Sequence, residues 1–247
     1  MSSSSSRASS RTMSERTGLV RIARGRGIAT VAVGAIVLLG ACGSGDSGST
    51  AEGPPETGSG APQEIESVEP DRVFAGIVRE PAPVVDQTPI PSLTYEGDEV
   101  VFRAQPGGLQ VVYFGYTNCP DVCPTTMFDH TVSLRLLPDD MADQIDTVMV
   151  TVDPERDLTL LSDYVESFVP DAEAAGTSDP ALLKAAADPF GVSYEVTTGS
   201  DGSVDVAHSG FLYVVGDTGE LLLAWPFGTS SEEMAADMFQ LMTVGVT

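Results

Sequence analysis

Basic residues, histidine and cysteine are all scarce in this chain. Its 247 residues include 12 Lys and Arg against 36 Asp and Glu, with two histidines and three cysteines. A net charge of −24 repels the phosphates of nucleic acids and of anionic lipids. Nucleic acid is therefore excluded as a partner, and so is membrane binding by charge alone. The few histidines and cysteines leave a short search for any metal or redox site.

Long apolar runs are missing as well. The run at residues 28–39 has twelve residues, whereas a helix that spans a bilayer needs about 20. Six arginines precede this run within residues 1–27, and small residues follow it, a pattern typical of a secretory signal. The ending Leu39-Gly40-Ala41-Cys42 resembles a bacterial lipobox, which implies cleavage before Cys42 and a lipid on its sulfur. The alternative is an ordinary signal or short anchor in which Cys42 is incidental.

Three segments are therefore expected. Residues 1–41 would be a lipoprotein signal peptide and residues 42–72 a lipid-anchored flexible linker, because residues 43–66 are rich in Gly, Ser, Pro and acids. Residues 73–247 would form the folded domain, held at the extracytoplasmic face of the bacterial cell membrane. Loss of residues 1–41 would leave 6 basic and 35 acidic residues, a net charge of about −29.

Alternating strand and helix signals follow the linker. The pattern predicts a β-hairpin over 93–102, buried strands over 109–116 and 145–152, and a C-terminal hairpin from strands 209–215 and 220–225. Helices are predicted over 124–137, 158–168, 179–187 and 231–242. This order is that of a thioredoxin-like α/β domain, with a central mixed sheet flanked by helices and an N-terminal β-hairpin extension.

Cys119 and Cys123 lie between the first buried strand and the helix after it. With Pro124 at the first helical position, Cys123 would be the helix cap. The free N–H groups of a helix N-terminus favour thiolate over thiol, while the charge of Asp121 opposes it. A disulfide across so short a loop would restrain little chain entropy, which disfavours a purely structural role. A redox pair, a metal site or both remain open.

Two thiolates are an incomplete metal site, so a third strong ligand is needed. His130 lies two turns along the predicted helix from Cys123, roughly 10 Å away, and is expected to be a surface or packing residue. His208 precedes the C-terminal hairpin, whose entry passes near the thiols in a thioredoxin-like fold. We therefore expect Cys119, Cys123 and His208 to form the ligand set. Two sulfurs and one imidazole suit copper, and Zn(II) fits the same set.

The chain resembles the Sco/SenC family of copper-binding, thioredoxin-like proteins linked to cytochrome c oxidase assembly. The matching motifs are Phe114-Gly-Tyr-Thr-Asn-Cys-Pro-Asp-Val-Cys-Pro-Thr125, Thr151-Val-Asp-Pro-Glu-Arg-Asp157 and His208-Ser209 before Phe211-Leu-Tyr-Val-Val215. They lie in the family's order within about residues 73–244. The resemblance implies that Cys119, Cys123 and His208 fall on the family's copper ligands, in either the Cu(I) or the Cu(II) state.

Two positions depart from the family pattern. Asn118 stands where a histidine is common, and Ala207 stands where an aspartate commonly precedes the ligand histidine. Neither change removes a ligand, but the second removes an acid that could orient the imidazole. Asp205 is the nearest candidate to replace it.

The motif at 153–157 is either a turn with local ion pairs or a segment that docks a partner or organises the site.

Two functions from different classes follow. The first is a metallochaperone that delivers copper to the cytochrome c oxidase copper-site subunit, served by a copper donor protein and a thiol reductant. Metal binding would be under thiol/disulfide control, because only reduced sulfurs bind the ion. The alternative is a thiol–disulfide oxidoreductase in which Cys119 and Cys123 reduce the cysteines of the oxidase copper site. A peroxidase-like scavenger ranks last, since no Thr and Arg setting for a peroxidatic cysteine is evident.

Overall fold

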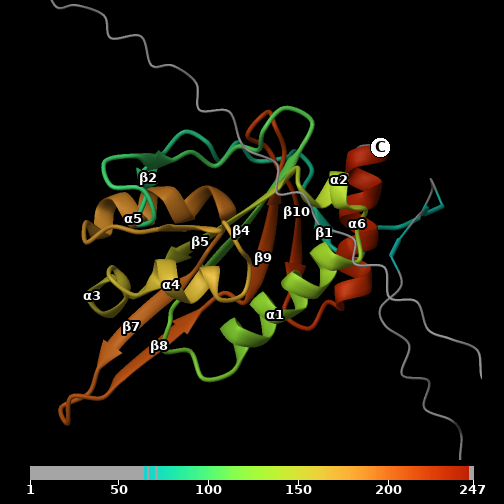
Figure 1. Cartoon of the computed structure of the whole chain (residues 1–247). Helices are drawn as coiled ribbons and strands as arrows, with labels where there is room; N and C mark the ends of the chain where they lie inside the picture. The colour runs from blue at the N-terminus through green and yellow to red at the C-terminus, as the bar shows by residue number, and fades with distance from the viewer. Residues whose placement is uncertain (1–63, 66, 70–71, 245–247) are drawn as a thin grey trace, which may run out of the picture. The chain divides into compact units, whose positions relative to one another are not determined.

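The structure is a computed structural model, which describes residues 64–65, 67–69 and 72–244 (Figure 1). The expected signal peptide, the lipid-bearing Cys42 and most of the expected linker lie outside these residues. No helix in the described part of the chain is long and apolar enough to cross a membrane.

One six-stranded mixed sheet forms the centre of the domain. Its order is β1-β10-β9-β4-β5-β6; β4, β5 and β6 are parallel, and β9 runs antiparallel to β4. Two smaller sheets, β2-β3 and β7-β8, have two strands each. The described strands are β1 (Ile77–Val78), β2 (Ile90–Pro91), β3 (Glu99–Val100), β4 (Leu109–Gly115), β5 (Ile145–Thr151), β6 (Glu173–Ala175), β7 (Tyr194–Thr198), β8 (Val204–His208), β9 (Phe211–Val215) and β10 (Leu221–Pro226).

Helices cover the sheet on both sides. Figure 1 shows α1 together with α6 on one side and α5 on the other. The described helices are α1 (Val122–Arg135), α2 (Asp139–Ala142), α3 (Pro154–Asp157), α4 (Leu161–Glu166), α5 (Pro180–Ala187), the 3-10 turn η1 (Asp188–Phe190) and α6 (Ser231–Thr243). The arrangement confirms the predicted thioredoxin-like α/β fold.

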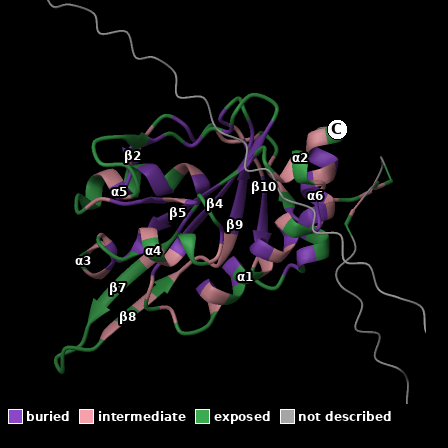
Figure 2. Ribbon diagram, viewed as in Figure 1, coloured by how far each residue is buried: buried purple, intermediate pink, exposed green. Residues whose placement is uncertain are grey.

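The central strands β4 and β5 are buried because helices cover both faces of the sheet. All seven residues of β4 are buried, and only Asp146 is exposed on β5 (Figure 2). Such continuous apolar runs are typical of parallel strands with helices on both faces. Each large side chain buried here stabilises the fold by about 1.5–3 kcal/mol relative to an exposed one. The buried strand β4 ends directly before the thiol-bearing loop.

Several predicted element boundaries are confirmed together with their local causes. Asp179 caps α5 by accepting from the N–H groups of Ala181 and Leu182 at 2.9 and 3.3 Å, with Pro180 at the first position. Ser230 and Glu233 form a capping box at the start of α6. The predicted C-terminal hairpin is β9–β10, and Gly219 takes φ +78° in its turn.

Other predictions need correction. The hairpin expected over 93–102 has only two-residue strands, β2 and β3, and the first lies before the expected start. The helix expected over 158–168 is α4, which is shorter, and α3 precedes it. Strands β1, β6, β7 and β8 were not predicted. Figure 2 shows why β7 and β8 are hard to recognise: all of their residues are exposed or half-buried, so they lack a buried apolar run.

Candidate metal centre

The parallel register of β4 and β5 determines which loops meet. Leu109 pairs with Ile145 and Gly115 with Thr151, so the two strands begin and end together. The loop that carries Cys119 follows β4, and the turn that becomes α3 follows β5. Both loops therefore lie at the carboxyl edge of the sheet, which is where sites form in open α/β sheets.

Helix α1 begins two residues earlier than predicted. Asp121 is its N-cap residue and Cys123 lies inside the first turn, so the expected capping role of Cys123 is wrong. Pro124 is accommodated because the N–H groups of the first turn have no intrahelical partner anyway. One of these free groups is used at the site: the Cys123 N–H donates to Cys119 Sγ at 3.3 Å.

The two thiols have opposite tendencies to ionise. Burial opposes ionisation of Cys119, but hydrogen bonds from the backbone N–H groups of Cys123 and Asp121 outweigh it and hold the pKa of Cys119 below its usual value. Burial raises the pKa of Cys123 to about 12. Asp121 thus aids the Cys119 thiolate through its backbone. The half-buried Cys119 is the more reactive thiol, and the buried Cys123 stays protonated until a metal or a disulfide partner displaces the proton.

His208 reaches the thiols from the end of β8. The Nδ1–H donates to the Ser209 carbonyl at 3.0 Å, which leaves Nε2 without a proton and 3.5 Å from Cys123 Sγ. Burial lowers the pKa of His208, while the nearby backbone carbonyls of Ser209 and Phe114 act in the opposite direction. A neutral imidazole with a free Nε2 lone pair is the form that binds metals.

The orientation of His208 corrects the prediction made for Asp205. Asp205 is exposed and lies three residues before His208, and therefore on the opposite face of the strand. A backbone carbonyl, that of Ser209, accepts the Nδ1 proton instead. Ala207 consequently leaves no gap in the hydrogen bonding of the imidazole. Carbonyl groups commonly fulfil this function for metal-binding histidines.

Cys119, Cys123 and His208 converge as the sequence predicted. Their two sulfurs and one ring nitrogen all lie within 4.8 Å of one another. Ligands at about 2.0–2.3 Å from one ion lie about 3.5–4 Å apart, so small side-chain rotations would complete the set. Cys119 and His208 also line a hollow of about 440 Å³, which gives the site access to solvent and to partners. The donor set fits copper or zinc.

Two tyrosines surround the imidazole from β4 and the loop after it. The rings of Tyr113 and Tyr116 contact His208 edge-to-face, with centroids 6.0 and 5.6 Å from its ring. Burial raises the pKa of Tyr116 to about 12, so its hydroxyl stays neutral. These rings pack against the imidazole edge-to-face and restrict its orientation. The motif at 114–125 contained Tyr116, but its role was not predicted.

His130 does not take part in the site. It is fully buried on α1, where Nε2 lies 2.9 Å from the Thr147 hydroxyl on β5, and burial lowers its pKa to about 4. The expectation of a packing role is confirmed, whereas the alternative of a surface position is wrong.

Asp157 is the site residue whose role the sequence left unresolved. It is fully buried at the end of α3 and accepts from the Thr117 N–H at 3.0 Å and the Thr117 hydroxyl at 2.6 Å. The Thr151 hydroxyl donates to it at 2.8 Å, and the Asp153 N–H donates to the same hydroxyl at 2.9 Å. Asp157 thus connects the ends of β4 and β5 and fixes the loop two residues before Cys119.

The motif at 153–157 combines both roles considered for it. Arg156 forms an ion pair with Asp153, as expected of a turn with local ion pairs. Asp157 organises the thiol loop. The spacing within the motif gave no sign of this contact, because Thr117 lies 40 residues away in sequence. Only the parallel register of β4 and β5 brings the two together.

Comparisons with known proteins agree with this geometry. A family model described as SCO1/SenC matches residues 92–243. An SCO2-like protein of Rickettsia conorii is 33% identical over 131 residues, which cover 52% of this chain and 63% of the relative. The chain therefore matches somewhat less than two thirds of that relative's length.

Solved structures show the same likeness. Apo Sco1 of Thermus thermophilus is 27% identical with a TM-score of 0.59, and the match covers 69% of this chain and 98% of that one. Copper-bound ScoI of Bradyrhizobium japonicum is 29% identical with a TM-score of 0.53, with 62% and 96% covered. Both similarities extend over nearly the whole of the solved domain.

Proposed function

The chain belongs to the SCO1/SenC family, and on this basis we propose that it is a copper metallochaperone. It would be anchored at the extracytoplasmic face of the cell membrane by a lipid on Cys42. Its copper would be destined for the copper-site subunit of cytochrome c oxidase, whose assembly is the process with which the family is linked. A copper donor protein and a thiol reductant would supply the metal and keep the sulfurs reduced.

The convergence of Cys119, Cys123 and His208 is the observation that carries the proposal. Two sulfurs and one ring nitrogen, all within 4.8 Å of one another, form a donor set that suits copper. Copper is favoured over zinc by the likeness to copper-bound ScoI of Bradyrhizobium japonicum.

The chain's own residues prepare the site in three ways. The N–H groups of Cys123 and Asp121 stabilise the Cys119 thiolate, and the Ser209 carbonyl keeps Nε2 of His208 free. Bound copper would be held by both sulfurs and that nitrogen. An external disulfide would take up two electrons and two protons from the two thiols and become two thiols, while Cys119 and Cys123 form a disulfide that can no longer hold the metal. Reduction by an external thiol would restore the site.

Copper binding by the reduced chain tests the proposal. We expect one copper per chain and a thiolate-to-copper charge-transfer band in the Cu(II) form. His208→Ala should abolish the normal band and weaken binding at least tenfold, because it removes the single nitrogen ligand. Asp205→Ala is the matched control, since this exposed side chain lies on the opposite face of β8 from His208, and it should bind like the wild type. An unchanged affinity and spectrum in His208→Ala would disprove the three-ligand site.

A thiol–disulfide oxidoreductase is the second candidate. The asymmetry of the thiols favours it: Cys119 is accessible with a lowered pKa, whereas Cys123 is buried beside it, as in an attacking and resolving pair. The substrate would be the disulfide of the oxidase copper-ligand cysteines. Complementation of oxidase assembly separates the two functions. A reductase tolerates His208→Ala, whereas a chaperone does not.

Anchoring is tested separately from metal binding. Cys42→Ser should move the protein from the membrane fraction to the soluble extracytoplasmic fraction and abolish incorporation of labelled fatty acid. Copper binding by the purified protein should not change, because Cys42 does not belong to the ligand set. Retention of the fatty-acid label by Cys42→Ser would refute lipidation at this position.

A further inference from the structure

We infer that a groove beside the thiols, between β7 and α3, is the surface on which the copper-accepting protein docks an extended segment. The segment would carry apolar side chains at alternate positions and at least one Lys or Arg. The inference rests on the proposed function for the identity of the partner. It adds the location of the contact and the chemistry that recognises the partner there.

The face of the β7–β8 hairpin connects the groove to the ligand set. Tyr194 pairs with His208 and Val196 with Val206, and residues directly opposite in an antiparallel pair share one face. Tyr194 and Val196 line the groove, whereas Val206 and His208 line the hollow at the thiols. A partner on this face would contact a metal ligand and the groove at once.

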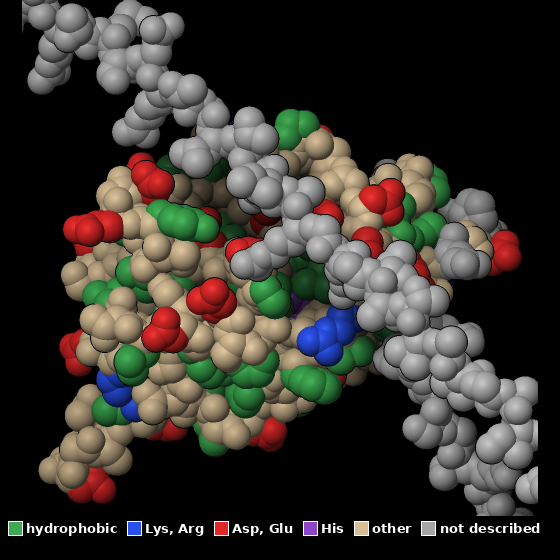
Figure 3. All heavy atoms as spheres, in the orientation of Figure 1, with side chains coloured by type: hydrophobic (Ala, Val, Ile, Leu, Met, Phe, Trp, Pro, Cys, Tyr) green, Lys and Arg blue, Asp and Glu red, His purple; other side chains and the backbone are tan. Residues whose placement is uncertain are grey.

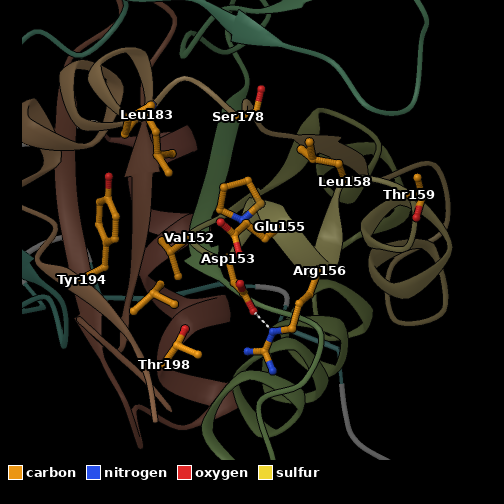
Figure 4. A pocket seen from close by; sticks show the side chains of 13 residues that line it. Val152, Asp153, Glu155, Arg156, Leu158, Thr159, Ser178, Leu183, Tyr194 and Thr198 are labelled. Carbon is orange, nitrogen blue, oxygen red and sulfur yellow. Dashed lines mark hydrogen bonds and ion pairs between the residues drawn. The ribbon is translucent and has the colours of Figure 1, made fainter. Parts of the chain in front are cut away.

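The groove itself is large and mainly apolar. It has a volume of about 590 Å³, and Figure 4 shows the side chains that line it from α3 to β7. Among these, Val152 and Leu183 are buried. Other lining residues are Leu158, Tyr194, Val196 and Thr198. Volumes of this order suit specific binding of apolar groups. Val196 is 42% exposed at the rim and has apolar surface available for a partner.

The free edge of β7 indicates that the occupant is extended. Strand β7 pairs only with β8 within the described residues, so its outer edge presents backbone donors and acceptors. Its five residues span about 13 Å at 3.3 Å per residue. A segment added along this edge would direct alternate side chains toward the groove, which is the usual mode of recognition by β-strand addition.

The charges around the groove favour a basic partner. Arg156 at the groove is paired with Asp153, and Lys184 on the adjacent helix α5 is paired with Asp188, which neutralises both cations. Glu155 is exposed at the groove and forms no ion pair among the described residues. Figure 3 shows acidic side chains scattered over this view of the molecule, with basic ones in small isolated patches. An approaching Lys or Arg would therefore meet net negative potential.

Copper transfer from the full mature chain, purified in detergent, tests the inference. The two acceptors are the reduced apo form of the oxidase copper-site subunit and a small copper chelator. Val196→Asp should slow transfer to the subunit at least tenfold and leave transfer to the chelator within twofold of the wild type. Val101→Asp is the control: Val101 is equally exposed, at 43%, and lies near the opposite end of β4. It should change neither rate.

Charge is tested in the same assay. Glu155→Lys should slow transfer to the subunit about threefold or more and flatten its dependence on ionic strength, whereas Glu96→Lys, at an exposed acid near β3, should not.

Equal rates for Val196→Asp and Val101→Asp would overturn the docking groove. So would a slower transfer to the chelator, since that would mean that the variant damages the metal site itself.

A direct binding measurement distinguishes the docking groove from the chaperone function. The affinity of the chain for a fluorescently labelled copper-site subunit is measured alongside transfer. Intact binding without transfer, weakened by Val196→Asp and not by Val101→Asp, would support the groove and refute the chaperone function. Transfer to the subunit that neither groove variant affects would support the chaperone function and refute the groove. Absence of any binding by the wild type would refute the groove as the docking site for this subunit.

Discussion

Replacement of Asp157 by Ala should destabilise both the fold and the thiol loop. The carboxylate is fully buried and accepts three hydrogen bonds, two from Thr117 and one from Thr151. Hydrogen bonds to a charged acceptor contribute about 1.5–3 kcal/mol each, and a buried donor without a partner costs about 1–3 kcal/mol. The two hydroxyls can rotate toward other acceptors, but the Thr117 N–H cannot. We therefore expect a loss of about 3–5 kcal/mol in the free energy of unfolding.

Urea denaturation of the reduced chain measures this loss, and Asp157→Asn is the matched control. The amide oxygen can still accept from the Thr117 N–H and the Thr151 hydroxyl, while its NH₂ can donate to the Thr117 hydroxyl oxygen. Asp157→Asn should therefore lose only about 1 kcal/mol. Thr117→Val should lose part of the same energy, and a double-mutant cycle with Asp157→Ala should show coupling of more than 0.5 kcal/mol.

The thiol loop supplies a second measurement, which distinguishes positioning from general stability. Under conditions in which all variants are folded, Asp157→Ala should alter the alkylation rate of Cys119 and weaken copper binding, whereas Asp157→Asn should restore both. A loss of stability below 1 kcal/mol in Asp157→Ala would refute the reasoning about the buried donors. Wild-type alkylation and copper affinity in that variant would refute the link from Asp157 to the thiols.

Two further predictions concern protonation. Because the pKa of Cys119 is lowered and that of the buried Cys123 is raised to about 12, limiting iodoacetamide at pH 8 should label Cys119 at least tenfold faster, as measured by peptide mass spectrometry; equal labelling would contradict the assignment. His130 has a pKa of about 4 in the folded state and about 6.5 when unfolded, so between these pH values the unfolded chain binds a proton that the folded chain does not. The contribution of His130 to the free energy of unfolding is therefore fully present above pH 6.5 and is lost as the pH falls toward 4. The loss should approach about 3 kcal/mol in urea denaturation, and His130→Gln should remove this part of the slope; an identical pH slope in both proteins would show that another group is responsible.

The sequence was sufficient for the parts of the fold that depend on local signals. Continuous apolar runs predicted the central strands, and capping residues predicted the starts of α5 and α6. The start of α1 was misplaced because Pro124 favours the first position of a helix but is also tolerated elsewhere in the first turn. Local preference could not decide between these positions. The N–H of Cys123, used by Cys119, decides it in the structure.

The sequence was sufficient to predict the candidate ligands of the site, but not the residues that position them. Cysteine and histidine are so rare here that Cys119, Cys123 and His208 could be named without a structure. Asp157 could not, because its contact with Thr117, 40 residues away in sequence, depends on the register of β4 and β5. Strand β7 lacks a buried face, and its position opposite His208 becomes evident only once the hairpin is formed.

The bond from His208 to the Ser209 carbonyl has a consequence for how such a site changes over evolution. A main-chain carbonyl is present whatever residue occupies a position, so no single substitution can delete it. The side chain at residue 207 therefore does not determine the orientation of the imidazole. An acid directly before the histidine is therefore not needed to orient the imidazole in this chain. Ala207, exposed beside the ligands, can therefore be substituted without loss of the hydrogen bond that orients the imidazole.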